Sequence, residues 1–284
     1  MLRIAINNQS IPWHDLHNLL NEANIKFPYT SNNAIIKSNN FPAELFNVDD
    51  DSISEIVYKG IADIGFCMEH TLSNTSSIKF TSYDKLGINK CNMSLIIPQS
   101  TNYKNIDWFN NKTIATSYPE LLSGLLKKHN IKANILKLKK NILKSVTLGL
   151  IDAAFDCIHT GTSLLNEQLK EVETLCTTET IMITAPTISP QNNILLDEFK
   201  IRINSQIKAR GKKMVFFSIP TASIDNLTEI LSRVGTTPKV INNIDENKSY
   251  LCALLDETIL WDITEKLKML GVDNIIVTPI NYII

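Results

Sequence analysis

The chain has 284 residues, 44% of them apolar and 20% charged, a composition typical of a globular protein with two or three compact units. Its formal net charge of −1 provides no basic field for wrapping nucleic acid, and no segment reaches the ~18 continuous apolar residues of a membrane-spanning helix. We therefore expect neither a nucleic-acid partner nor a membrane partner. Residues 1–6 are too short an apolar run for a signal peptide, so we expect a cytoplasmic location.

Short extended runs alternate with helical ones along the first part of the chain, which is typical of an α/β protein. A capping box at Ser52 and Glu55 predicts the start of a helix, and Gly60 stands where that helix would end. The predicted elements here are strand 2–6, helix 15–23, extended runs 34–37 and 43–47, the helix from Ser52, and strands 62–67 and 92–98. Residues 100–111 are predicted to lead into a second unit.

The second unit repeats this alternation. Ser117, Pro119 and Glu120 predict the N-cap, first-turn proline and capping-box acid of a helix that ends near Asn130. The remaining predicted elements are strands 113–116, 134–138 and 150–155, helices from about residue 141 and at 164–169, and strand 179–185.

From residue 213 onward the pattern is β-α-β-β-α-β, the order of a ferredoxin-like unit. Its two helices carry apolar residues at helical spacing, which predicts core stripes and no catalytic site. The six predicted elements are 213–219, 222–234, 239–244, 250–255, 258–270 and 274–278.

The five cysteines are predicted to be buried thiols, because they are odd in number and contain no C-x-x-C pair that would indicate a disulfide framework or a zinc site. They are Cys67, Cys91, Cys157, Cys176 and Cys252. His14 and His17 lie three residues apart on a predicted helix, but no third ligand accompanies them. No metal site formed by protein side chains alone is predicted.

A strand, a tight hydroxyl-rich loop and a helix are predicted in succession around Asp156–Ser163. The backbone N–H groups and hydroxyls of such a loop point at one spot, where the helix N-terminus stabilises an anion such as phosphate. Asp156, at the end of the strand, can accept hydrogen bonds from sugar hydroxyls or hold Mg²⁺. This combination predicts a phosphoribosyl site, with an ordinary capped turn as the alternative.

Three segments between Thr113 and Ala185 resemble ATP phosphoribosyltransferase, the first enzyme of histidine biosynthesis. They are Ile114–Pro119, Gly149–Ala153 and Asp156–Leu164. Further similar pieces extend the resemblance over nearly all of the chain. They are the acidic triplet 49–51, the run 60–65, and the tail segments 265–271 and 275–280, which resemble the regulatory domain of the family's long form.

The resemblance implies an α/β fold with two Rossmann-like lobes around a cleft, similar to type II periplasmic binding proteins, and a C-terminal ferredoxin-like regulatory domain. The predicted domains are 1–99 with 179–210, 100–178 with the phosphate loop, and 211–284. The implied reaction is a Mg²⁺-dependent displacement at the ribose C1 of phosphoribosyl pyrophosphate by the adenine N1 of ATP, with inversion. The resemblance also implies ATP or AMP as ligands, histidine as a candidate inhibitor, and a homo-oligomer, from dimer to hexamer.

The predicted substrate-binding residues centre on the phosphate loop, with Asp156 directed toward the ribose hydroxyls. The phosphate contacts are assigned to His159, Thr160, Gly161, Thr162 and Ser163. Glu69, an acid that the family shares, is a further candidate. No catalytic residue is assigned, because the reaction needs no covalent nucleophile.

The chain departs from the family pattern on the substrate side, where two strongly anionic substrates require positive charge. The loop 7–12 carries no charge, although the family has a Lys and an Arg there, and Ser10 replaces a loop glycine. Further departures are Val48 and Asn92 in place of arginines, Leu143 in place of a sugar-binding Glu, and Met68 in place of a glycine. Compensating charge is available from Lys37, Lys90, Lys139 and Lys140.

Two functions therefore remain open at this stage. One is a phosphoribosyltransferase that makes phosphoribosyl-ATP and pyrophosphate. The other is a catalytically impaired paralogue that keeps a phosphate pocket for nucleotide binding or regulation, since the missing basic groups would each contribute roughly 1.5–3 kcal/mol. The tail segment 237–239 also differs from the family's Ser-Pro-Thr-like segment near the effector region.

Overall fold

The computed structural model describes residues 1–10, 12–29, 33–75, 83–158, 162–243 and 245–284. Its contacts divide the chain into two compact units, Met1–Asp197 and Glu198–Ile284. The boundary falls inside helix α6 (Pro190–Ala209), a helix that the sequence pattern did not predict. The predicted domain limits at residues 99, 178 and 210 stay a prediction.

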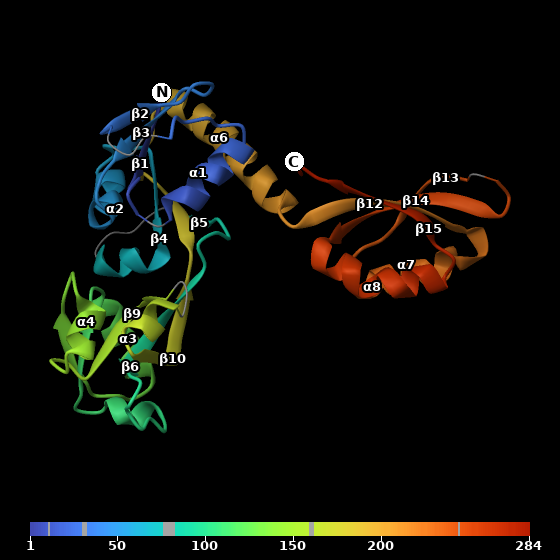
Figure 1. The fold of residues 1–284 in the computed structure, drawn as a ribbon. Helices are drawn as coiled ribbons and strands as arrows, with labels where there is room; N and C mark the ends of the chain where they lie inside the picture. Colours follow the sequence, from blue (N-terminus) through green and yellow to red (C-terminus); the bar gives the residue numbers. More distant parts are fainter. Residues whose placement is uncertain (11, 30–32, 76–82, 159–161, 244) are drawn as a thin grey trace. The chain divides into compact units, whose positions relative to one another are not determined.

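The first lobe of unit one is a six-stranded sheet in the order β2-β3-β1-β4-β11-β5 (Figure 1). Strands β1 (Leu2–Ile6), β3 (Ala43–Asn47) and β4 (Ile64–Met68) are parallel, so their C-terminal ends meet at one edge. Strand β2 (Ile35–Lys37) pairs antiparallel with β3, and β11 (Thr180–Thr184) pairs antiparallel with β4 on one side and with β5 (Tyr83–Lys85) on the other. The helical segments are α1 (Trp13–Glu22), α2 (Asp50–Tyr58) and the short 3₁₀ helix η1 (Glu69–Thr75).

Helix α2 packs closely on this sheet because the strand below it carries a glycine. A side chain on Gly65 would place its Cβ 2.7 Å from the Cγ2 atoms of both Ile53 and Val57. These two residues join Ala5, Ile181 and Ile183 in one buried apolar cluster. The helix therefore holds its N-terminus, with the acidic triplet, at the edge where the parallel strands end.

The second lobe is a five-stranded sheet in the order β10-β6-β9-β7-β8. Strands β7 (Thr113–Thr116), β8 (Asn134–Lys137) and β9 (Ala153–Ile158) are parallel. Strand β6 (Cys91–Pro98) is antiparallel to β9 and to the edge strand β10 (Leu169–Thr178). The helices are η2 (Ile106–Phe109), α3 (Pro119–Lys128), α4 (Ile142–Thr147) and α5 (Thr162–Asn166).

The two sheets share a topology in which a strand that arrives from the other lobe lies beside the third parallel strand. In each, the second, first and third parallel strands are followed by the incoming strand and then by an edge strand. The chain crosses between lobes from β5 to β6 and returns from β10 to β11. The expected two-lobe fold of the type II periplasmic-binding-protein kind is confirmed.

Several element boundaries differ from the sequence expectations. Helix α2 begins at Asp50, so Ser52 lies inside it and Glu55 pairs with Lys59 instead of closing a capping box. Tyr118, not Ser117, is the N-cap of α3, and the Ser117 hydroxyl donates to the Leu138 carbonyl.

Two further differences lie in the second lobe. The helix expected over 164–169 ends at Asn166, and the chain continues as β10, a ten-residue strand that was not predicted. Within the expected linker 100–111, Phe109 is fully buried in the lobe's core beside Ile114, Leu122 and Phe155.

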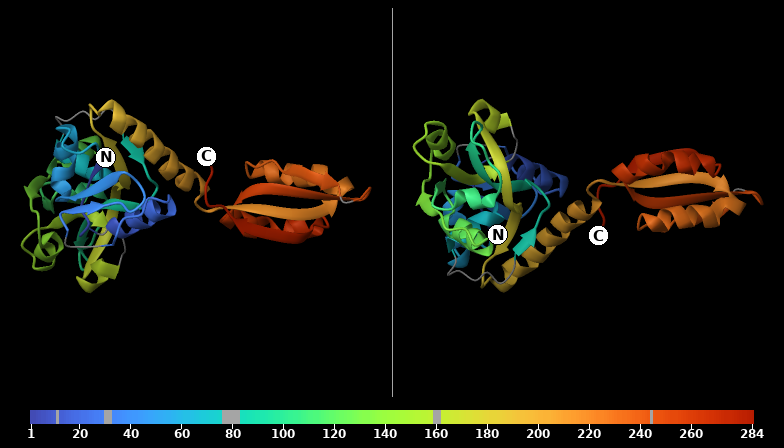
Figure 2. Two further views of the ribbon diagram at one scale, coloured as in Figure 1. Left: turned by 90° about the horizontal axis from the view of Figure 1, so that it is seen from above. Right: turned by 90° about the horizontal axis from the view of Figure 1, so that it is seen from below.

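Unit two confirms the ferredoxin-like order, with an antiparallel sheet β13-β14-β12-β15. Both helices pack on one face of this sheet, on a core that includes Val215, Phe217, Leu227, Leu231 and Leu267 (Figures 1 and 2). The elements are β12 (Lys212–Pro220), η3 (Thr221–Ser223), α7 (Ile224–Arg233), β13 (Lys239–Asn243), β14 (Lys248–Asp256), α8 (Glu257–Met269) and β15 (Asp273–Pro279). Within the described part of the chain, no helix is both long and apolar enough to span a membrane.

Candidate functional site

The candidate site lies where the parallel strands of both lobes end. In an open α/β sheet, ligands bind beyond the carboxyl ends of the strands. In the first lobe these ends are followed by Asn7 after β1, by Val48 and the acidic triplet 49–51 after β3, and by Glu69 after β4. In the second lobe, Tyr118 lies two residues beyond β7 and Lys139 two residues beyond β8. The topology thus gathers residues that are far apart in the sequence.

Contacts between the lobes bring these two edges together. The Lys139 Nζ lies 2.9 Å from the Asp51 Oδ2, and the rings of His70 and Tyr118 meet edge to face with centroids 4.5 Å apart. Burial and then the carboxylates of Asp156, Asp51 and Asp50 raise the pKa of Tyr118 well above its usual range. Carboxylates from both lobes therefore act electrostatically on one tyrosine.

Sequence reasoning missed this role of Tyr118. Tyr118 lies in the Ile114–Pro119 segment that carries the family resemblance. In the sequence, however, only its neighbours Ser117, Pro119 and Glu120 have a recognisable signal, that of a helix start. The signal that could have found it was its place just after a parallel strand.

The loop after β1 donates hydrogen bonds to neighbouring elements of the first lobe, one from a side-chain amide and one from a backbone N–H. The Asn7 Nδ2 donates to the Asp50 Oδ2 at 2.9 Å, and the Asn8 backbone N–H donates to the Asn47 Oδ1 at 3.0 Å. Burial raises the pKa of Asp50, the Asn7 hydrogen bond lowers it, and the adjacent Asp51 and Asp49 raise it. This loop thus supplies structural hydrogen bonds at positions where the family resemblance places positive charge.

The phosphate loop follows β9 directly. The Asp156 carboxylate accepts a hydrogen bond from the Cys157 backbone N–H at 2.8 Å, next to the end of the strand. His159, Thr160 and Gly161 lie outside the described residues. Thr162 and Ser163 lie in the first turn of α5. Asp156 lies near the end of β9, and both its contact with ribose and the loop itself remain predictions.

Glu69 lies in the first lobe, directly after β4 and at the start of η1. Its Oε2 is 2.9 Å from the Lys85 Nζ, which is also 3.8 Å from the Glu179 Oε1. Hydrogen bonding to Glu69 is the main cause that raises the pKa of Lys85. The Glu69 carboxylate is consequently ion-paired with Lys85, and both residues line a pocket.

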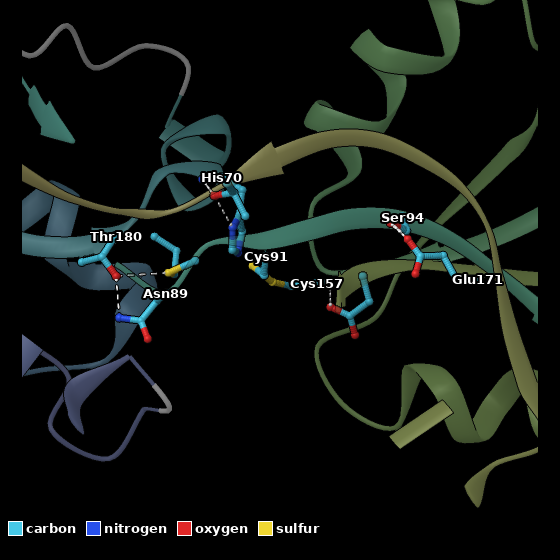
Figure 3. The surroundings of a disulfide bond; sticks show 10 residues. His70, Asn89, Cys91, Ser94, Cys157, Glu171 and Thr180 are labelled. Atoms are coloured by element: carbon cyan, nitrogen blue, oxygen red, sulfur yellow. Dashed lines mark hydrogen bonds between the residues drawn. A yellow bond between two sulfur atoms is a disulfide. The ribbon is translucent and has the colours of Figure 1, made fainter. Parts of the chain in front are cut away.

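The structure links two of the cysteines that were expected to be free thiols. A disulfide joins Cys91 at the start of β6 to Cys157 near the end of β9, with the Cα atoms 6.3 Å apart (Figure 3). The expectation of free thiols is wrong for these two residues, because antiparallel pairing of β6 with β9 brings together positions 66 residues apart. Cys67, Cys176 and Cys252 are free.

The departures from the family pattern have different structural consequences. Val48 packs against the apolar cluster under α2, and Leu143 packs against the cluster beneath α4. Asn92 lines a pocket beside Lys90. Of the compensating lysines, Lys139 is paired with Asp51, and Lys37 lies exposed on β2.

Comparison with known proteins decides the family. The family model of ATP phosphoribosyltransferase matches residues 49–205. An ATP phosphoribosyltransferase from Bacteroides thetaiotaomicron is 33% identical over 284 residues, covering 100% of both chains. The chain belongs to the ATP phosphoribosyltransferase family. A relative of that name from Azobacteroides pseudotrichonymphae is 34% identical, again over 100% of both chains.

The family's fold is shared with a solved structure. The ATP phosphoribosyl transferase (HisG:HisZ) complex from Thermotoga maritima matches with a TM-score of 0.58 and 20% identity, covering 72% of this chain and 96% of that chain. The protein is accordingly a phosphoribosyltransferase of histidine biosynthesis. The alternative of a catalytically impaired paralogue is not favoured, because the relatives match from end to end.

Proposed function

We propose that the cleft between the two lobes transfers the phosphoribosyl group from phosphoribosyl pyrophosphate to the adenine N1 of ATP. A bond forms between N1 and the ribose C1 while the bond from C1 to the pyrophosphate oxygen breaks, and pyrophosphate leaves with the bonding electrons. The observation that carries this assignment is the contact between the strand ends of the two lobes, where Lys139 pairs with Asp51 and the ring of His70 meets the ring of Tyr118. The family and the position of the phosphate loop after β9 support it.

In this proposal the residues act by binding and orientation. His159, Thr160, Gly161, Thr162 and Ser163 hold the 5′-phosphate through the loop and the start of α5, and Asp156 accepts hydrogen bonds from the ribose hydroxyls. Glu69 contacts substrate from the first lobe. When two reactants are held in a near-attack arrangement, their reaction becomes effectively unimolecular. This supplies much of the rate enhancement without a covalent intermediate.

Mg²⁺ fits this site as a companion of the substrate. Among the residues that the structure describes, no group of three or more His, Cys, Asp or Glu side chains is placed to hold a metal. Mg²⁺ commonly uses only one or two carboxylates together with substrate phosphates. Asp156 would supply such a carboxylate, and the ion would neutralise charge on the leaving pyrophosphate.

The other features of the family are proposals for this chain. We propose a cytoplasmic homo-oligomer, between dimer and hexamer, that also binds AMP and is inhibited by histidine through the tail. Sedimentation of the full chain with and without histidine, together with turnover measured over the same histidine range, tests these points. A monomer whose turnover is unchanged by millimolar histidine would contradict them.

Formation of phosphoribosyl-ATP, followed spectrophotometrically at saturating Mg²⁺, tests the reaction itself. Turnover near the usual enzyme range of about 1 s⁻¹ or above is the expected result. Binding of AMP or phosphoribosyl pyrophosphate without any turnover would contradict the proposal and revive the impaired paralogue.

A further inference from the structure

A pocket of about 250 Å³ lies where the chain crosses between the lobes. It is built from the end of β4, the crossing segment from β5 to β6, and the end of β10. The lining residues are Glu69, Lys85, Lys90, Cys91, Asn92, Thr177, Thr178 and Glu179. We call it the Lys90 pocket. Its volume is sufficient for a pyrophosphate group, and it adjoins Glu69, which the proposed function places against substrate.

The two carboxylates of this pocket already have donors. The Glu69 carboxylate binds the Lys85 ammonium at 2.9 Å. The Glu179 Oε2 accepts the Gly87 backbone N–H at 2.7 Å, and its Oε1 lies 3.8 Å from Lys85. Lys85 is thus shared between two acids and has little capacity left for a ligand.

Lys90 differs from Lys85 in this respect. Its side chain lines the pocket, and within the described part of the chain its ammonium makes no hydrogen bond or ion pair. Asn92, which stands where the family resemblance places an arginine, lines the same pocket and adds an amide donor, and Thr177 adds a hydroxyl. The pocket therefore combines an uncommitted ammonium with neutral donors. These are the groups that bind phosphate oxygens.

Other basic candidates are less suited to this role. Lys139 is engaged by Asp51, and Lys37 lies on β2, beyond β3 in the sheet order. The loop after β1 carries no charge. Lys90 is the candidate lysine that the described structure places in a pocket with Glu69 and Asn92.

We infer that the Lys90 pocket binds a polyphosphate group of a substrate, with Lys90 supplying charge that the family resemblance assigns to other positions. This inference rests on the proposed function. The shared chemistry is a chain of phosphates, which belongs either to the triphosphate of ATP or to the pyrophosphate of phosphoribosyl pyrophosphate. The carboxylates of Glu69 and Glu179 also face the bound group, so it binds best when Mg²⁺ accompanies it.

The test compares Lys90→Gln with Lys90→Arg and with Lys104→Gln, a control at an exposed lysine outside the site. We expect Lys90→Gln to raise the KM of one substrate about 10-fold or more, with the arginine variant close to the wild type. A rise for ATP identifies the triphosphate, a rise for phosphoribosyl pyrophosphate identifies the pyrophosphate, and a rise for both shows that the pocket serves both substrates.

Calorimetric titration of the full chain with magnesium pyrophosphate and magnesium tripolyphosphate gives a second readout. Lys90→Gln should weaken the binding of at least one probe about 10-fold, while Lys104→Gln should leave it unchanged. If the wild type binds a probe through Lys90 yet shows no turnover, the proposed function fails and the pocket stands. Probe affinities and KM values within twofold of the wild type in Lys90→Gln, or no probe binding by the wild type, would overturn the inference.

Discussion

Two loops that follow parallel strands in the two lobes differ in their chemical character. One begins after β1, the first parallel strand of its sheet, and the other begins after β9, the third parallel strand of its sheet. The C-terminal ends of such strands form the edge where ligands bind. The loop after β9 follows Asp156 and contains hydroxyls and a glycine suited to a phosphate. The loop after β1 carries the Asn7 side-chain amide, which donates to Asp50, and the Asn8 backbone N–H, which donates to the Asn47 Oδ1. The fold thus specifies where a loop lies, while its side chains decide whether it binds substrate.

The same contrast extends to the residues around each loop. A disulfide lies near the end of β9, at Cys157, whereas Val48, near the end of β1, packs against apolar side chains. Positive charge near the cleft is carried by lysines on the connecting segments, at Lys90 and Lys139. The two loops should therefore respond very differently to substitution.

The largest effect is expected from breaking the disulfide between Cys91 and Cys157. The disulfide closes a segment of 66 residues, and a loop of that size stabilises the folded chain by roughly 4 kcal/mol in the chain-entropy model. Cys157→Ser, or reduction of the wild type, should lower the free energy of unfolding by an amount approaching this value. Denaturant unfolding of the oxidised and reduced full chain measures it.

Cys252→Ser, a free cysteine of the second unit, is the control for that experiment. Its unfolding should keep the same dependence on reductant as the wild type. Identical unfolding curves for oxidised and reduced wild type, or free thiols at both Cys91 and Cys157 by mass spectrometry in air-equilibrated buffer, would contradict the prediction.

Blocking the β9 loop should remove substrate binding. Gly161→Val adds a branched side chain where the backbone is proposed to approach a phosphate, so we expect AMP and phosphoribosyl pyrophosphate to bind about 100-fold more weakly or not at all. Calorimetric titration measures the affinity, with circular dichroism to verify the fold. Gly124→Ala is the matched control, because it lies in α3 of the same lobe with open space around it. Unchanged affinity in a folded Gly161→Val protein would refute the loop assignment.

Adding charge to the β1 loop tests the other half of the comparison. A lysine at Asn8 would bury its ammonium, because that residue is only 5% exposed, whereas Gln9 is exposed. Gln9→Lys should raise kcat/KM about 10-fold through one new charged hydrogen bond to substrate. Gln99→Lys, exposed at the end of β6, is the control with the same charge change. If both variants raise kcat/KM equally, a general field effect and not the loop is responsible.

The smallest effect is expected at Asp50, where the β1 loop contacts α2. Because burial raises the folded-state pKa of this carboxyl above its ordinary value of 3.8, folding favours the protonated form, and stability falls as pH rises through the folded pKa. Asp50→Asn should therefore stabilise the unliganded protein at pH 7 by less than about 1 kcal/mol. The gain should disappear as pH falls below the unfolded pKa. Thermal unfolding across pH measures this, and destabilisation at pH 7 would show that the Asn7 hydrogen bond outweighs burial.

Much of the fold was predictable from local patterns. The six elements of the tail were predicted in their correct order, because each combines a strong apolar period with a clear turn. The return of strand 179–185 to the first lobe was implied by the family resemblance and is confirmed by its pairing with β4. The sequence pattern did not predict helix α6 or strand β10. In α6 the apolar residues do not follow a single stripe, and the burial of β10 does not alternate regularly.

The sequence by itself determined the fold class and the family, since these depend on short segments and their spacing. Only the tertiary structure decided that Tyr118 meets His70 of the other lobe, that Cys91 meets Cys157, and that Lys90 shares a pocket with Glu69. These contacts join residues about 20 to 70 positions apart. They arise from the register of antiparallel strands and the convergence of parallel strand ends, which no local pattern in one sequence specifies.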